Sequence, residues 1–392
     1  MIHQASTKQI LLKRSLRFAS LILALLLSGV PALSSAAEAP AEADRLSIAV
    51  EALNRLKGMD LEANAAVKTA VYKVLGQIRG KPQFVEIVRD FKIKDQDSEL
   101  LKVALKNPDN ATGVDALLLM LENGSVDLLR GVLEGGDKDQ AILLAVLAGN
   151  SGANQIAALL KPLLTNSKLD FALRQHAVRS LAKVETGVAS ILAVAIEGRL
   201  PDDLKPLASA ELAKARWEKL REEALKILPP TVQGVITKPL PSISELSKRT
   251  GNPTRGGAVF RREETACIRC HQIQNEGIDF GPKLTEIGTK LGKEALYEAI
   301  LNPSAGISFG FEAWSLELKN GDEPFGLVVS DTAEEIALKA QTGIVSRYRK
   351  TDILRKEQQK TSIMPAGLEQ AMSVDELVDL VEYLTTLKKA EP

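Results

Sequence analysis

The chain has 392 residues, of which 45% are apolar and 26% charged, and its formal net charge is zero. This length suggests two or three domains, and the apolar fraction is enough to form their cores. The balanced charge excludes the strongly basic composition typical of nucleic-acid-binding proteins, so we expect no nucleic-acid partner. Aromatic residues make up only 4% of the chain, which favours helices packed through small side chains over a β-sandwich.

The first segment has the layout of a secretory signal peptide. Basic residues, among them Lys13 and Arg14, precede the apolar run Phe18–Val30, and the small residues around Ala36 suit cleavage. An uncleaved anchor is the alternative, but the run is shorter than the roughly 20 residues that span a bilayer. We therefore expect residues 1–37 to be removed. The mature protein would be periplasmic or otherwise extracytoplasmic in a bacterium, with no integral membrane segment.

Residues 45–233 carry apolar residues at helical spacing, in segments separated by short Gly, Asn, Asp and Pro clusters. The stretch "LRQHAVRSL" resembles the first helix of a HEAT repeat, and "LKPLASAEL" matches it, so that Leu181 and Leu212 occupy equivalent positions. Each stretch is followed by a second helical pattern. Recurring helix pairs predict a HEAT-like α-solenoid, in which each pair buries its apolar face against the next. An irregular helical bundle is the alternative.

A linker and a second domain are expected after these helices. Prolines that break helices mark residues 234–255 as the linker, and the second domain covers residues 256–389. Its predicted elements are a helix at "GGAVF", a helix from Lys293, a β region at about 313–350 with a tight turn at Asn320-Gly321, and a last helix opened by a capping box at Ser373. The predicted fold class is thus mainly α, with a small β insertion.

Both cysteines of the chain lie in "TACIRCHQIQ", where Cys267 and Cys270 are followed directly by His271. A disulfide at this spacing would close only a very small loop and add little stability. A structural zinc site needs four ligands, and this motif supplies at most three. A thioredoxin-like dithiol would have to follow a strand and open a helix, whereas a helical pattern precedes this motif.

Covalent haem attachment explains the motif best. Two thiols at this spacing can add across the two vinyl groups on one edge of a porphyrin, and the adjacent histidine then reaches the iron from one face. The export signal and the absence of any other cysteine favour this interpretation. We therefore expect one covalently attached haem c, held by Cys267 and Cys270, with His271 as an iron ligand.

Residues downstream of the motif resemble class I cytochromes c. In that class, a proline at the place of Pro282 offers its carbonyl to the outer nitrogen of the proximal histidine. The segment "TSIMPAGL" places Met364 before a proline in a turn-rich stretch, and a methionine thioether is a common sixth ligand of haem iron. A core methionine is the alternative. Leu284, with Phe280 and Ile363, is expected to form the pocket wall.

The whole second domain resembles the haem-binding cytochrome c family of planctomycete and Verrucomicrobium type. The matching stretches, in chain order, are "RGGAVF", "CIRCH", "GIDFGPKLTEIG", "AILNPSAGI", "SIMPAGL" and "ELVDLVEYL". The resemblance implies a class I cytochrome c-like domain with a β insertion between the proline and methionine loops. Members are often fused to dehydrogenase or β-propeller domains, and this chain has neither.

The expected function is one-electron transfer by an exported monohaem cytochrome, with no catalytic residues of its own. Its expected partner is a redox protein, a dehydrogenase or another cytochrome, and a dehydrogenase docked on the solenoid is the source of electrons that the architecture suggests. The alternative is a haem-based redox or gas sensor, or a helical-repeat scaffold without a carrier role. A peroxidase is disfavoured because the chain has a single Cys-x-x-Cys-His motif.

Overall fold

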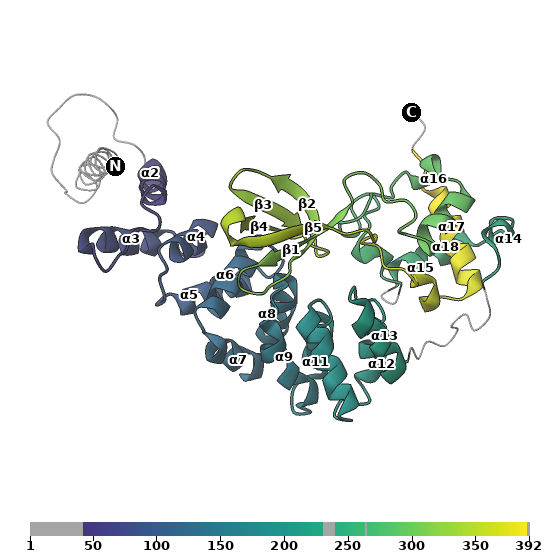
Figure 1. The fold of residues 1–392 in the computed structure, drawn as a ribbon, viewed down its shortest axis with the longest axis horizontal. Coiled ribbons are helices and arrows are strands. Elements are labelled where there is room, and N and C mark those ends of the chain that lie inside the picture. Colours follow the sequence, from purple (N-terminus) through teal and green to yellow (C-terminus); the bar gives the residue numbers. More distant parts are fainter. Residues whose placement is uncertain (1–41, 230–239, 263–264, 390–392) are drawn as a thin grey trace, which may run out of the picture. The chain divides into compact units, whose positions relative to one another are not determined.

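The computed structural model of the protein describes residues 42–229, 240–262 and 265–389. These residues form 17 α-helices and one five-stranded antiparallel sheet near the C-terminal end (Figure 1). The expected mainly α fold with a small β region is therefore confirmed at this level. The expected signal peptide, residues 1–37, and residues 234–239 of the expected linker lie outside the described ranges. Within those ranges, no helix combines the length and the apolar character needed to cross a membrane.

Internal contacts divide the chain into two compact units, Met1–Val103 and Ala104–Pro392. This division falls inside the range 45–233, which the sequence predicts as one repeat domain. In the first unit, the side chain of Asn64 caps a helix by accepting the Val67 N–H, and Val71 and Phe84 are fully buried. The described helices of this unit are α2 (Glu42–Asn54), α3 (Ala65–Gln77), α4 (Pro82–Asp90) and the greater part of α5 (Asp97–Lys106).

The second unit begins with a series of short helices joined by tight turns. They are α6 (Ala111–Glu122), α7 (Val126–Glu134), α8 (Lys138–Ser151), α9 (Ile156–Thr165), α10 (Phe171–Leu181), α11 (Glu185–Ile196), α12 (Lys205–Leu212) and α13 (Glu218–Ile227). Helix α10 contacts both α11 and α12, and α13 contacts both α11 and α12. Leu181 and Leu212, matched in the sequence, each end the first helix of a pair and are fully buried. The two helix pairs therefore pack against each other, α10 on α12 and α11 on α13.

Five α-helices and three short 3-10 helices follow in the same unit. The α-helices are α14 (Ile243–Ser247), α15 (Pro253–Arg261), α16 (Ile287–Lys290), α17 (Lys293–Leu301) and α18 (Val374–Thr386). The 3-10 helices are η1 (Cys267–Arg269), η2 (Lys350–Asp352) and η3 (Leu368–Ala371). Their common core contains Phe260 of α15, Tyr297 of α17 and Leu377 of α18. The predicted capping box is confirmed, because Ser373 and Glu376 each accept a hydrogen bond from the other's backbone N–H.

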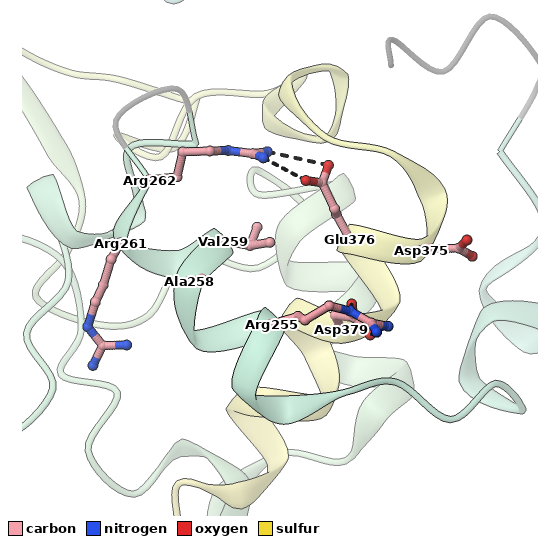
Figure 2. Close-up of a pocket in the computed structure, with 8 residues that line it drawn as sticks. All are labelled: Arg255, Ala258, Val259, Arg261, Arg262, Asp375, Glu376 and Asp379. Carbon is pink, nitrogen blue, oxygen red and sulfur yellow. Dashed lines mark hydrogen bonds and ion pairs between the residues drawn. The ribbon is translucent and has the colours of Figure 1, made fainter. Parts of the chain in front are cut away.

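Helices α15 and α18 approach each other very closely. A Cβ atom on Gly256 would overlap the backbone carbonyl of Asp379, so only glycine fits at this contact. Around the contact, Arg255 pairs with Asp379 at 2.6 Å and Arg262 pairs with Glu376 at 2.6 Å. Figure 2 shows these two pairs between the helices, with Arg261 pointing away from them. Close backbone packing and ion pairs therefore hold together two helices that are far apart in the sequence.

The sheet lies between α17 and α18 in the sequence. Its strands are β1 (Ala313–Leu318), β2 (Phe325–Asp331), β3 (Glu335–Lys339), β4 (Val345–Arg349) and β5 (Ile353–Gln358), in the order β4-β3-β2-β1-β5. The predicted turn at Asn320-Gly321 joins β1 and β2, and Gly321 adopts the left-handed backbone that such turns need. The sequence predicts that the β region ends at about residue 350. In the structure β5 extends it, because this strand pairs antiparallel with β1, opposite Trp314 and Ser315.

Candidate functional site

All the site residues expected from the sequence line one cavity of about 1000 Å³ in the second unit. They are Cys267, Cys270, His271, Pro282, Leu284 and Met364. Phe280 and Ile363, the other expected wall residues, line the same cavity. The segments that supply these residues lie far apart in the sequence, so only the tertiary fold brings them together.

The cysteines are held by a short irregular segment after α15. Thr265 is fully buried, and its hydroxyl donates to the backbone carbonyls of Val259 and Arg262, which ties the segment to the end of the helix. Ala266 then takes a left-handed backbone conformation (φ 58°), and η1 begins at Cys267. Both cysteines are partly buried free thiols. The segment thus presents two thiols to the cavity from one turn of helix.

Burial controls the chemistry of both thiols. It raises the pKa of Cys267 to about 11, and it raises the pKa of Cys270 as well. Both groups are therefore protonated near neutral pH. A redox-active dithiol depends on a lowered thiol pKa, so this environment counts against the dithiol interpretation. The helix α15 in front of the motif, where that interpretation needs a strand, also counts against it.

His271 is fixed in orientation from two sides. Its Nδ1 lies 2.7 Å from the backbone carbonyl oxygen of Pro282, and because a carbonyl only accepts, Nδ1 carries the proton. A Cβ atom on Gly281 would lie 2.8 Å from Cε1 of the ring, so glycine leaves the space that the imidazole fills. Burial lowers the pKa of His271 and keeps the ring neutral. The other ring nitrogen, Nε2, is therefore unprotonated and suited to bind a metal.

The loop around the histidine is tied to the cysteine segment through the backbone. The carbonyl of Cys270 accepts hydrogen bonds from the N–H groups of Phe280, at 3.2 Å, and Gly281, at 2.6 Å. Leu284 N–H donates to the carbonyl of Gln272 at 2.9 Å. These bonds connect both ends of the segment from Cys270 to Leu284. The thiols and the imidazole are consequently parts of one rigid loop.

Met364 follows the sheet in the sequence and lines the same cavity as the cysteines. Its N–H donates to the hydroxyl of Ser362 at 3.2 Å, and Ser362 N–H donates to the hydroxyl of Ser304 at 3.0 Å. Met364 is partly buried and packs on the same apolar core as Cys267 and Leu284. Met372 also lines the cavity, but it is 2% exposed and belongs to the core itself. His176 lies on α10 and is not among the lining residues.

Charged residues of the preceding helices lie beside the cysteines, and sequence reasoning did not identify them. Arg269, between the two cysteines, pairs at 3.3 Å with Glu211 of α12, a carboxylate only 9% exposed. Lys183 and Lys214 line the same part of the cavity. Lys183 is exposed, and its ammonium group donates to Asn150 Oδ1 at 2.8 Å. The sequence carried no signal for these contacts, because they depend on how α10 and α12 pack against the motif.

The sheet insertion also reaches the cysteines. The side-chain amide of Gln341, in the turn between β3 and β4, lies 3.3 Å from the sulfur of Cys270. Just before α13, the guanidinium carbon of Arg216 lies 4.3 Å from the ring centre of Trp217 and 4.8 Å from that of Phe325, a residue of β2. The cavity is therefore bounded by the cysteine loop, the sheet insertion and the helices before the linker.

The lining residues fit a covalently held haem. Two thiols from one turn, a neutral imidazole with its outer nitrogen engaged, a thioether and an apolar wall are the groups that such a cofactor requires. Gly281 has no side chain that would displace the His271 imidazole, so the ring can keep the orientation that an iron ligand needs. Among the described residues, no three His, Cys, Asp or Glu side chains converge as ligands for a metal ion bound directly by the protein.

No protein-family model matches the chain, and a comparison with curated proteins finds no similar sequence.

Proposed function

We propose that the protein is an exported monohaem c-type cytochrome that transfers single electrons. The observation that carries this proposal is the shared cavity of Cys267, Cys270, His271 and Met364, with the imidazole held by the Pro282 carbonyl. When bound, haem c would supply an iron that alternates between the ferrous and ferric states. The chain has no catalytic residue in this scheme and acts as a carrier.

Each site residue has a separate role in the proposal. Cys267 and Cys270 would hold the haem through two thioether bonds, and His271 and Met364 would supply the nitrogen and sulfur ligands of its iron. Pro282 keeps Nδ1 of His271 engaged, which fixes the ring and increases its basicity as a ligand. Leu284 and Phe280 exclude water from the apolar wall. With both His271 and Met364 as ligands, the iron would have no position free for a substrate molecule.

The fold supports a cytochrome c-like module of the haem-binding family that the sequence resembles. Helices α15 and α18 cross at Gly256 around the core, and the sheet is inserted between the proline loop and the methionine loop. The paired packing of α10–α13 supports HEAT-like repeats before the module. In this proposal the repeats dock a redox partner, a dehydrogenase or another cytochrome, outside the cytoplasm.

Covalent attachment is tested by an intact mass of the protein from its native host, together with a pyridine haemochrome spectrum. We expect the mass of the processed chain plus one haem, and a spectrum typical of two thioether links. A Cys267→Ala/Cys270→Ala variant is the matched control and should have the mass of the bare chain. A native protein with the mass of the bare chain would overturn the proposal.

The axial ligands are tested by adding carbon monoxide to the reduced protein. If His271 and Met364 both bind the iron, the spectrum should stay low-spin and change little on addition of the gas. A Met364→Ala variant opens one position and should bind carbon monoxide readily. Ready binding by the wild-type protein would exclude Met364 as a firm ligand and would favour a gas sensor.

A further inference from the structure

The β3–β4 hairpin lies directly against the loop that carries the cysteines and the histidine. Lys339, at the end of β3, forms an ion pair with Asp279 at 2.9 Å. In the turn, Gly343 packs so closely on Ile278 that an added Cβ atom would lie 3.3 Å from its side chain. Two independent contacts thus connect the hairpin with the residues just before Pro282.

The turn of this hairpin brings a hydrogen-bond donor to one sulfur of the motif. Gln341 Nε2 lies 3.3 Å from Cys270 Sγ, and Ala340, Gln341 and Thr342 all line the cavity. The turn is held by two backbone bonds of 2.8 Å, from Ala340 N–H to the Ile344 carbonyl and from Gly343 N–H to the Ala340 carbonyl. A thiol sulfur and a thioether sulfur are both weak acceptors, so the contact is compatible with either state of Cys270.

We propose that Gln341 is a positioning residue of the haem site, and that the hairpin carrying it covers the side of the cavity on which the cysteines lie. This inference rests on the proposed function. The amide orients the Cys270 sulfur without adding charge, and the turn restricts the access of water to it. Exclusion of water disfavours the ferric state of the iron, which carries the greater positive charge. A hydrogen-bond donor at the Cys270 sulfur withdraws electron density from the sulfur. Both effects raise the reduction potential.

Two substitutions separate the hydrogen bond from the cover. Gln341→Leu keeps the bulk of the side chain and removes the donor, whereas Gln341→Ala removes both. We expect both haem-loaded variants to have lower midpoint potentials than the wild type, and the alanine variant to show the larger shift. Gln341 is exposed, so thermal stability should hardly change. The matched control is Gln358→Leu, an exposed glutamine on β5 that does not line the cavity.

A second measurement does not depend on the haem. In the apo-protein, we expect nuclear Overhauser contacts between the Gln341 side-chain amide protons and the β-protons of Cys270, and their loss in Lys339→Met. Unchanged potentials in both Gln341 variants, or absence of the contacts in the apo-protein, would overturn the role of Gln341 while leaving the haem assignment intact. A native chain that carries no haem would overturn the proposed function first, and this inference with it.

Discussion

Gly256 is the residue at which α15 and α18 make their closest contact. An added Cβ atom would overlap the Asp379 carbonyl in the interior of α18, where the backbone cannot shift without breaking helical hydrogen bonds. We expect Gly256→Ala to lower the free energy of unfolding by about 1–3 kcal/mol, as overpacking of a core does. Urea unfolding measures the change. Gly131→Ala, in the exposed interior of α7 with nothing near the added atom, should instead stabilise by up to about 1 kcal/mol. Equal effects would contradict the packing argument.

Asp379 makes the stability of the same contact depend on pH. Its carboxylate is 3% exposed, and Arg255 holds its pKa below the ordinary value of 3.8. A lowered pKa in the folded state means that the stabilisation is fully present above the unfolded value and is lost as the pH falls through the folded value. Glu376 behaves in the same way, because Arg262 lowers its pKa.

We therefore expect Asp379→Asn to destabilise the protein most near neutral pH. The difference in unfolding free energy from the wild type should shrink as the pH falls below about 4, the ordinary pKa of an aspartate in the unfolded chain, and disappear below the lower pKa of the folded state. Urea unfolding of both proteins at neutral and at acid pH measures this difference. A difference that is independent of pH would show that the charge of Asp379 is not what stabilises the contact.

Among the elements, α18 begins at a capping box in which the Ser373 hydroxyl serves as the N-cap. The Ser373 hydroxyl accepts the Glu376 N–H at 3.2 Å. We expect Ser373→Ala to lower the free energy of unfolding by about 1 kcal/mol, as loss of an N-cap does. Ser373→Asp, which keeps an acceptor, should restore most of the loss. Thermal or urea unfolding measures both. If aspartate gives no rescue, the hydroxyl does not act as a cap.

The sequence predicts those elements that depend on a few neighbouring residues. The capping box at Ser373, the helix from Lys293 and the turn at Asn320-Gly321 appear as predicted. Strand β5 was missed because "ILRKEQ" is largely polar and its partner β1 is far away in the sequence. In the site, the motif and Met364 could be identified from residue type and context. Gln341 could not, since an exposed glutamine in a turn has no sequence signal for a neighbouring sulfur.

For the whole molecule, the two compact units should unfold separately. We expect calorimetry to resolve two transitions, one for residues up to Val103 and one for residues from Ala104. Because a group bound only by the native state stabilises it, haem attachment should raise the second transition and leave the first unchanged. Gly256→Ala should lower that same second transition. A single transition that shifts as a whole on haem attachment would contradict this division.

The close pairing of α15 with α18 also sets an order of events during synthesis. The Cys267–His271 segment leaves the ribosome well before α18, yet the core around it needs Leu377 and Leu380 from that last helix. Contacts between such distant parts of a chain form late. Throughout this interval both thiols belong to a chain whose core is still incomplete. Under the proposed function, haem would be attached outside the cytoplasm, to a chain whose core α18 has not yet closed.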